Sequence, residues 1–286
     1  MRRSLYLCVM VCSLLVLGSV FVAGAAAKKP VTLVYVEWDC AAATTHLAKV
    51  AIEDKFGVSV ELLPVSAAAM WASVASGDAD ATLTAWLPGT HASYLKKLQG
   101  QFEDLGPLVT GARLGWAVPE YVPITSMKEV AANAKKFNNI ITGIDAGAGL
   151  MELSEKAMKV YGLNAMTLQD GSGATMVAAL GDAVRRNEWI VVTAWSPHWM
   201  FGRWNLRYLE DPEGTLGGSE GIHTIVRQGL KKDMPEIYAF LDAFRYEDIS
   251  QLQTLMAWNQ EKGADLDANG RRFMKEYPDL AASWFK

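Results

Sequence analysis

The sequence predicts an α/β protein in which two similar modules face each other. Thr-Ala-Trp-Leu-Pro at residues 84–88 recurs as Thr-Ala-Trp-Ser-Pro at residues 193–197. Each copy ends a stretch in which apolar runs of strand length alternate with segments of helical spacing. Such alternation predicts a mostly parallel sheet flanked by helices. Because ligands of open α/β sheets bind beyond the carboxyl ends of the strands, the two tryptophans mark the expected site.

The first module contains three predicted strands and two predicted helices. Its opening run, Val-Thr-Leu-Val-Tyr-Val, is rich in β-branched residues and is typical of a buried strand. Gly57 follows the first helical stripe and provides the left-handed residue at which helices commonly end. The predicted elements are a strand at residues 31–36, a helix at 43–55, a strand at 58–63, a helix at 67–76 and a strand at 81–85 that leads to Trp86.

The second module repeats this pattern. A strand is predicted at residues 140–144, then a helix that ends near Gly162, and a final strand at residues 189–194. The tail at residues 234–285 has apolar stripes at helical spacing and is expected to pack on the first module. No long flexible linker separates the modules, so we expect short hinge crossovers to join them.

Residues 1–27 have the features of a secretory signal peptide. Two arginines precede an apolar stretch at residues 4–22, and an Ala-x-Ala site lies before Lys28. The apolar stretch is also long enough to span a bilayer, so an uncleaved membrane anchor is the alternative. In both cases we expect the rest of the chain in the periplasm. The predicted boundaries are 1–27 for the signal peptide, 28–115 for the first part of lobe I, 116–211 for lobe II, and 212–286 for the return to lobe I with the C-terminal helices.

Composition and charge exclude several classes of protein. The chain has 286 residues, 51% of them hydrophobic, and a formal net charge of −4, which becomes about −6 without the first 27 residues. An acidic protein without clustered lysines or arginines repels polyanions, so no nucleic-acid partner is expected. Cys40 is the one cysteine after residue 27, which excludes an intramolecular disulfide. We expect a monomer that is stabilised by its core.

The sequence carries no recognisable catalytic or metal-binding motif. Its four histidines form no pair at metal-ligand spacing, and neither G-x-S-x-G nor H-E-x-x-H occurs. We therefore expect no catalytic residue, no metal and no cofactor. Gly147-Ala148-Gly149 lacks the rest of a phosphate loop, but glycines at a helix start let backbone N–H groups approach a carboxylate.

Trp38, Trp86 and Trp195 each close a predicted strand where a polar or proline-containing loop begins. Three indoles that converge on one cleft form an aromatic cage. Such a cage suits a quaternary ammonium, which cannot donate a hydrogen bond but is attracted to the ring faces, with each ring contributing about 0.5–2 kcal/mol. The tryptophans expected in the core are Trp71, Trp116, Trp189, Trp258 and Trp284.

Four motifs together resemble the glycine betaine receptors of bacterial compatible-solute importers. They are Val36-Glu37-Trp38, the first Thr-Ala-Trp-Leu-Pro with its following histidine, Gly-Ile-Asp-x-Gly-Ala-Gly at residues 143–149, and Trp-Ser-Pro-His-Trp at residues 195–199. The resemblance covers essentially the whole chain after residue 27. It implies a two-lobed periplasmic binding protein with a type II-like fold, which delivers its ligand to the permease and ATPase of an ABC importer.

The resemblance also implies a role for each candidate residue. The three strand-end tryptophans would hold a trimethylammonium group, and His91 with the backbone N–H groups of Gly149 and Leu150 would hold a carboxylate. The implied ligand is glycine betaine or a related zwitterion. A receptor for proline betaine, carnitine, choline or a sulfonium zwitterion is the alternative, although choline has no carboxylate. A secreted enzyme that acts on such compounds is a more distant alternative.

The residues beside the tryptophans leave two questions open. If Asp39 faced the ligand, its charge would favour choline; otherwise we expect it to cap a helix that begins near Ala42. Cys40 is expected to be a small buried residue. His198 lines the cleft or supports its own loop, and we favour the loop.

Overall fold

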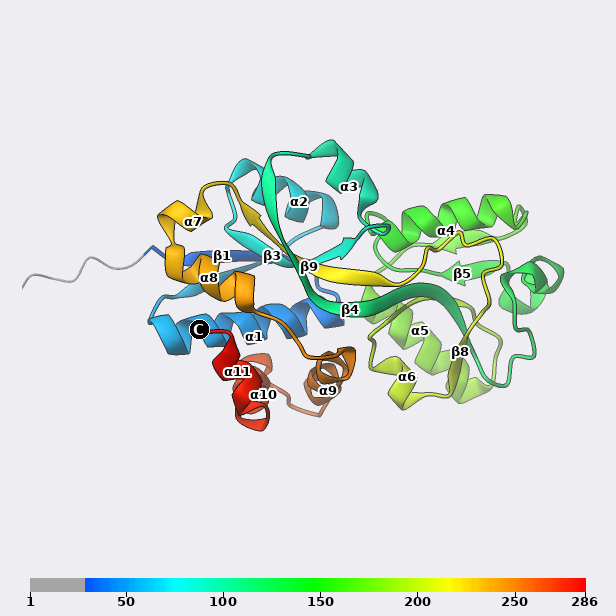
Figure 1. Ribbon diagram of the computed structural model, residues 1–286. Coiled ribbons are helices and arrows are strands. Elements are labelled where there is room, and N and C mark those ends of the chain that lie inside the picture. The colour runs from blue at the N-terminus through cyan, green and yellow to red at the C-terminus, as the bar shows by residue number, and fades with distance from the viewer. Residues whose placement is uncertain (1–28) are drawn as a thin grey trace, which may run out of the picture.

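The computed structural model describes residues 29–286, so the predicted signal peptide lies outside the described residues. These residues form one nine-stranded mixed sheet in the order β2-β1-β3-β9-β4-β7-β5-β6, with β8 paired to β4. The chain forms two halves side by side, and β4 and β9 run between them (Figure 1). The predicted architecture, two α/β lobes joined by short crossovers, is confirmed.

The first half contains the three parallel strands that the sequence predicts. Strand β1 (Val31–Tyr35) lies between β2 (Val60–Pro64) and β3 (Ala81–Leu87). Helices α1 (Asp39–Phe56) and α2 (Ala67–Ser76) connect these strands in the predicted order. The carboxyl ends of β1 and β3 therefore lie at the same edge of the sheet, which brings the residues that follow them together.

Helix α1 ends where the sequence predicts but begins earlier. Gly57 has a φ of 60°, and its N–H bonds to the carbonyl of Glu53. The helix begins at Asp39, whereas the apolar stripe indicates a start near residue 43. Residues 40–45 are all small, and most are buried, so they fill the helix start without forming a stripe.

The second half repeats the parallel arrangement. Strand β5 (Ile140–Thr142) lies between β6 (Thr167–Gln169) and β7 (Val192–Ser196). Helices α4 (Gly149–Val160) and α5 (Gly173–Arg186) follow β5 and β6. The beginning of α4 and the end of β7 thus face the edge at which β1 and β3 of the first half end, as the repeated modules predict.

Two long antiparallel strands carry the chain between the halves. Residues 102–112 of β4 (Phe102–Pro119) pair with β9 (Glu220–Arg227), and residues 113–117 of β4 pair with β7. Strand β9 also pairs with β3. Sequence patterns do not predict the first part of β4, because glycines and a proline interrupt it.

The C-terminal helices pack on the first half, as predicted. A Cβ atom on Gly270 would lie 2.9 Å from Val50 Cγ2 and 3.2 Å from Leu47 Cα, so this glycine permits the close approach of a C-terminal helix to α1. Trp284 is 1% exposed and packs on Phe244, with 4.7 Å between ring centroids. The remaining elements are α3 (Ala92–Lys97), η1 (Met127–Glu129), η2 (Ala131–Phe137), α6 (Met200–Arg203), β8 (Leu206–Tyr208), α7 (Leu230–Asp233), α8 (Pro235–Ala243), α9 (Ile249–Asn259), α10 (Leu266–Glu276) and α11 (Pro278–Ser283).

The expected core tryptophans fall into two groups. Trp71, Trp116 and Trp284 are at most 1% exposed. Trp189 and Trp258 are only partly buried, and Lys136 and Arg272 lie over their respective rings. The prediction is thus confirmed for the first group, whereas the second lies at the edge of the core.

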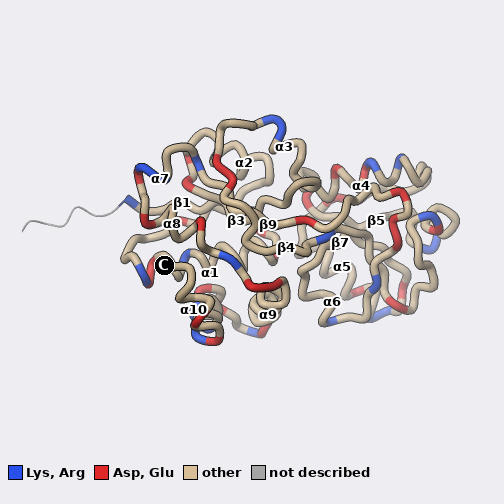
Figure 2. Tube along the Cα trace, in the orientation of Figure 1, with Lys and Arg blue, Asp and Glu red and all other residues tan. Residues whose placement is uncertain are grey.

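Charged residues of both signs alternate along the two halves (Figure 2). Within residues 29–286, none of the helices combines the length and the apolar character needed to cross a membrane.

A buried ion pair links the first half to the crossing strand β9. Asp80, 2% exposed, accepts hydrogen bonds from the backbone N–H of Thr32 at 2.9 Å and from Nε of Arg227 at 2.7 Å. Arg227 also donates to Asp233 at 2.7 Å. The pair joins the residues before β3 to β1 and to the end of β9.

Replacing Asp80 with alanine should lower the free energy of unfolding by about 3–5 kcal/mol, because it leaves the Arg227 guanidinium buried without its main partner. Urea unfolding of the purified protein measures this change. Asp78→Ala, at an exposed position two residues away, is the matched control and should stay within about 0.5 kcal/mol of the parent protein. Equal effects of the two substitutions would contradict a structural role for the ion pair.

Candidate functional site

One pocket lies between the two halves, at the edge where the parallel strands end. It contains about 310 Å³ of empty space, part of it open to solvent. All six candidate residues line it: Trp38, Trp86, His91, Gly149, Leu150 and Trp195. The sequence did not single out the other lining residues as part of a site: Cys40, Thr90, Leu114, Ile144 and Ala148.

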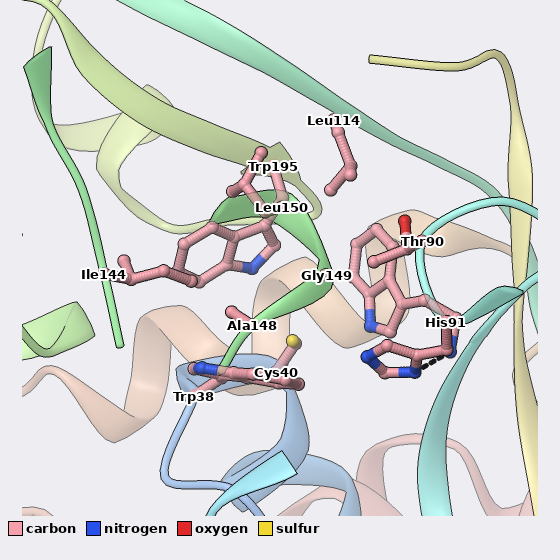
Figure 3. A pocket seen from close by; sticks show the side chains of 11 residues that line it. Trp38, Cys40, Thr90, His91, Leu114, Ile144, Ala148, Gly149, Leu150 and Trp195 are labelled. Carbon is pink, nitrogen blue, oxygen red and sulfur yellow. Dashed lines mark hydrogen bonds between the residues drawn. The ribbon is translucent and has the colours of Figure 1, made fainter. Parts of the chain in front are cut away.

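The three tryptophans reach the pocket from three different strand ends. Trp38 follows β1 and occupies the position before α1, whereas Trp86 and Trp195 lie in the last residues of β3 and β7. Their exposed fractions are 7%, 3% and 3%. In the close-up view the rings of Trp38 and Trp195 lie on opposite sides of the pocket (Figure 3). The two halves of the repeat thus contribute indoles to one space.

The residues that line this pocket include no aspartate, glutamate, lysine or arginine. A cation in the pocket would therefore be attracted by indole faces and not by an ion pair. This attraction is stronger when water is excluded, and the lining residues other than the partly buried Leu114 are buried. The arrangement is suited to a cation whose charge is spread over methyl groups.

His91 is a neutral hydrogen-bond donor at the pocket. Its side chain is completely buried, and its Nδ1 accepts the backbone N–H of Trp86 at 3.0 Å. The proton of the neutral ring must then be on Nε2, which is buried and has no hydrogen-bond partner. Burial lowers the pKa of the His91 imidazole to about 3. The ring packs edge-on against Trp71, with 5.7 Å between centroids, which fixes its orientation.

The start of α4 approaches the loop after β3 closely. A Cβ atom on Gly149 would lie 2.0 Å from the carbonyl oxygen of Thr90, so only glycine permits this contact. No side chain caps the helix, because the residue before it is Ala148. The first N–H groups of α4, among them those of Gly149 and Leu150, are positioned at the positive end of the helix dipole. They are suited to bind an anion at the pocket.

Among residues 29–286, no three His, Cys, Asp or Glu side chains are grouped in a way that could hold a metal ion.

Residues 29–276 match the OpuAC family, the substrate-binding domain of ABC-type glycine betaine transport systems. The chain belongs to this family.

Relatives with known structures cover nearly the whole OpuAC-family chain. A lactococcal OpuAC, solved in a closed conformation with glycine betaine, is 38% identical, with a TM-score of 0.85; the match covers 91% of this chain and 100% of the other. The ProX glycine betaine/L-proline-binding protein of Borrelia burgdorferi is 36% identical, with a TM-score of 0.86 over 90% and 97% of the two chains.

A curated relative matches over a shorter stretch. The glycine betaine/carnitine transport binding protein GbuC of Listeria monocytogenes is 40% identical over 152 residues. This stretch is 52% of the present chain and 50% of the relative.

A buried glutamate positions the loop that carries His91 in this OpuAC-family protein. Glu220, 5% exposed at the start of β9, accepts hydrogen bonds from the backbone N–H of Thr90 at 3.0 Å and from its hydroxyl at 3.0 Å. Burial raises the pKa of the Glu220 carboxyl. The sequence gives no sign of this contact, because 130 residues separate the partners.

Asp39 and His198 do not line the pocket. Asp39 lies in the first turn of α1, so the prediction that it caps a helix starting near Ala42 is wrong. Its carboxylate accepts a hydrogen bond from Gln260 at 3.0 Å and lies 3.4 Å from His198 Nε2. His198 Nδ1 accepts a hydrogen bond from the N–H of Met200 at 3.1 Å. The side chain therefore stabilises its own loop, which is the role favoured from the sequence.

The His91 ring should stay neutral, with its proton on Nε2, from pH 8 down to about pH 4. Its pKa is lowered from 6.5 to about 3. The unfolded chain therefore gains a proton as the pH falls through 6.5, and the folded chain does not. His91 thus lowers the free energy of unfolding as the pH falls from 6.5 to about 3. Nitrogen NMR of labelled histidine measures the ring state, and His91→Gln assigns the signal. Titration of this ring near pH 6.5 would contradict the prediction.

Proposed function

We propose that this protein is a receptor for glycine betaine or a closely related quaternary-ammonium zwitterion. The three indoles hold the trimethylammonium group by cation–π attraction. Nε2–H of His91 and the backbone N–H groups of Gly149 and Leu150 bind the carboxylate. The observation that carries the proposal is a buried pocket with no charged side chain in its lining, in which His91 Nε2 has no partner.

An uncharged pocket favours a zwitterion over a simple cation. A zwitterion carries one positive and one negative charge. The indole faces attract the positive charge and the N–H groups bind the negative charge, so no charged side chain is needed inside the pocket. Choline brings only the cation and would leave His91 Nε2 and the helix N–H groups buried without an acceptor, which costs free energy. Proline betaine and carnitine also carry both charges and remain the alternative ligands. They differ from glycine betaine in size. GbuC, the relative named for both glycine betaine and carnitine, supports this class.

We propose that the protein acts in the periplasm as the receptor of an ABC importer. It closes its lobes around the ligand and delivers it to permease and ATPase subunits. Membership of a family of ABC-type substrate-binding domains supports this role. We keep the lobe boundaries 28–115, 116–211 and 212–286 as part of this proposal. The protein performs no chemistry on its ligand, because cation–π contacts and hydrogen bonds to a carboxylate bind without activating any bond.

Titration with a panel of ligands tests the proposed site. Glycine betaine should bind with a 1:1 stoichiometry, measured by calorimetry and by tryptophan fluorescence. Choline and glycine, which each lack one end of the zwitterion, should bind at least about tenfold more weakly. Tighter binding of choline than of any betaine would contradict the role of His91, and no binding of any onium compound would contradict the cage.

Gly149→Ala should weaken betaine binding about tenfold to a hundredfold, since the new Cβ atom would lie 2.0 Å from the Thr90 carbonyl oxygen and hold the lobes apart. Gly147→Ala is the matched control two residues away, where an added Cβ has no atom within 4 Å. Small-angle scattering with saturating betaine should show a larger radius of gyration for Gly149→Ala than for the parent protein, and no increase for Gly147→Ala. Identical radii and affinities for both variants would overturn the prediction.

A further inference from the structure

One hydrogen bond joins a cage tryptophan of the first half to the second half. Nε1–H of Trp38 donates to Oδ2 of Asp145 at 2.7 Å, across 107 positions of sequence. Asp145 is partly buried and lies between β5 and α4. Its carboxylate is not part of the pocket lining. The bond therefore reaches the indole from outside the pocket, at its N–H edge, while the ring itself lines the pocket.

This bond sets the orientation of the Trp38 ring. A rotation of the indole about its Cβ–Cγ bond would move Nε1 away from Oδ2, so the hydrogen bond favours the orientation that lines the pocket. Trp195 differs, because no carboxylate accepts a hydrogen bond from its buried Nε1. A negative charge at the N–H edge of Trp38 also adds to the electron density of the ring, which favours a cation at its face.

The segment that carries Asp145 also carries the proposed carboxylate-binding N–H groups. Asp145 stands four residues before Gly149, and the hydroxyl of Tyr94 in the first half donates to the carbonyl of Gly147 at 3.0 Å. Residues 145–150 therefore contact the first half at Trp38, Tyr94 and Thr90. The contact of Gly149 with Thr90 and the hydrogen bond of Asp145 with Trp38 are present together in this structure.

We infer that Asp145 is a positioning residue that latches Trp38 in the cage orientation when the lobes close, and so couples binding of the carboxylate to completion of the cage. This inference rests on the proposed function. The latch forms only when the halves meet, so it slows the release of the ligand and leaves its first encounter with the open protein unchanged.

Stopped-flow tryptophan fluorescence with glycine betaine tests the latch. Asp145→Ala should raise the dissociation rate constant about tenfold or more, because a hydrogen bond to a charged group is lost, and should change the association rate constant less than about twofold. Asp145→Asn keeps a hydrogen-bond acceptor, so its dissociation rate constant should lie between those of Asp145→Ala and the parent protein. Asp170→Asn, an exposed carboxylate after β6 in the same half, removes the same charge and should match the parent protein.

A double-mutant cycle identifies the partner. Trp38→Phe keeps an aromatic ring without the N–H donor, so Asp145→Ala should have almost no further effect on the dissociation rate constant in that background. An equal effect of Asp145→Ala in both backgrounds would overturn the assignment of Trp38 as the partner. A lower Tm of ligand-free Asp145→Ala with an unchanged dissociation rate constant would make Asp145 a stabilising residue only and would overturn the inference.

The two proposals fail in different ways. If the parent protein does not bind any onium compound, the proposed function is wrong. If the parent protein binds glycine betaine and Asp145→Ala releases it at the same rate, the proposed function stands and the latch is wrong.

Discussion

The close approach of Gly149 to the carbonyl of Thr90 is the constraint on which the rest of the site depends. It brings the start of a helix in one lobe against a loop of the other. Burial lowers the pKa of the His91 imidazole in the same loop to about 3 and keeps the ring a neutral donor. The same desolvation strengthens the attraction between indole faces and a cation. A side chain at residue 149 would force the start of this helix away from the loop that carries His91.

The crossing strand β9 holds the binding loop in place. Glu220 at its start binds the backbone and hydroxyl of Thr90, and Arg227 at its end binds Asp80 next to β3. The two contacts fix both ends of β9 to segments that flank β3, the strand that contains Trp86. A strand that passes between the lobes therefore also positions the loop that carries His91. The connection between the lobes and the placement of the candidate site residues therefore share one element.

Local patterns in the sequence identified most of the fold and the three tryptophans of the pocket, whereas His91, Gly149 and Leu150 were assigned through the resemblance to betaine receptors. The repeated Thr-Ala-Trp pentapeptide located Trp86 and Trp195, and the end of the first strand located Trp38. Gly57 marked the end of α1. The start of α1 was missed because its small residues form no apolar stripe. The first part of β4 was missed because Gly106, Pro107 and Gly111 interrupt the residue pattern that is typical of a strand. Leu114, which also lines the pocket, lies on that long strand and carries no local sign of its role.

The sequence by itself determined which side chains stand at the ends of strands, because periodicity and turn residues act over a few positions. Only the tertiary structure decided how these side chains are used. The proton of His91 is on Nε2 because the backbone of Trp86 occupies Nδ1, and the Trp38 ring is oriented by Asp145 from the other lobe. Asp39 lies outside the pocket because α1 begins with it. The hydrogen bond between Trp38 and Asp145, which are 107 positions apart, depends on how the two lobes meet, and no local pattern encodes that.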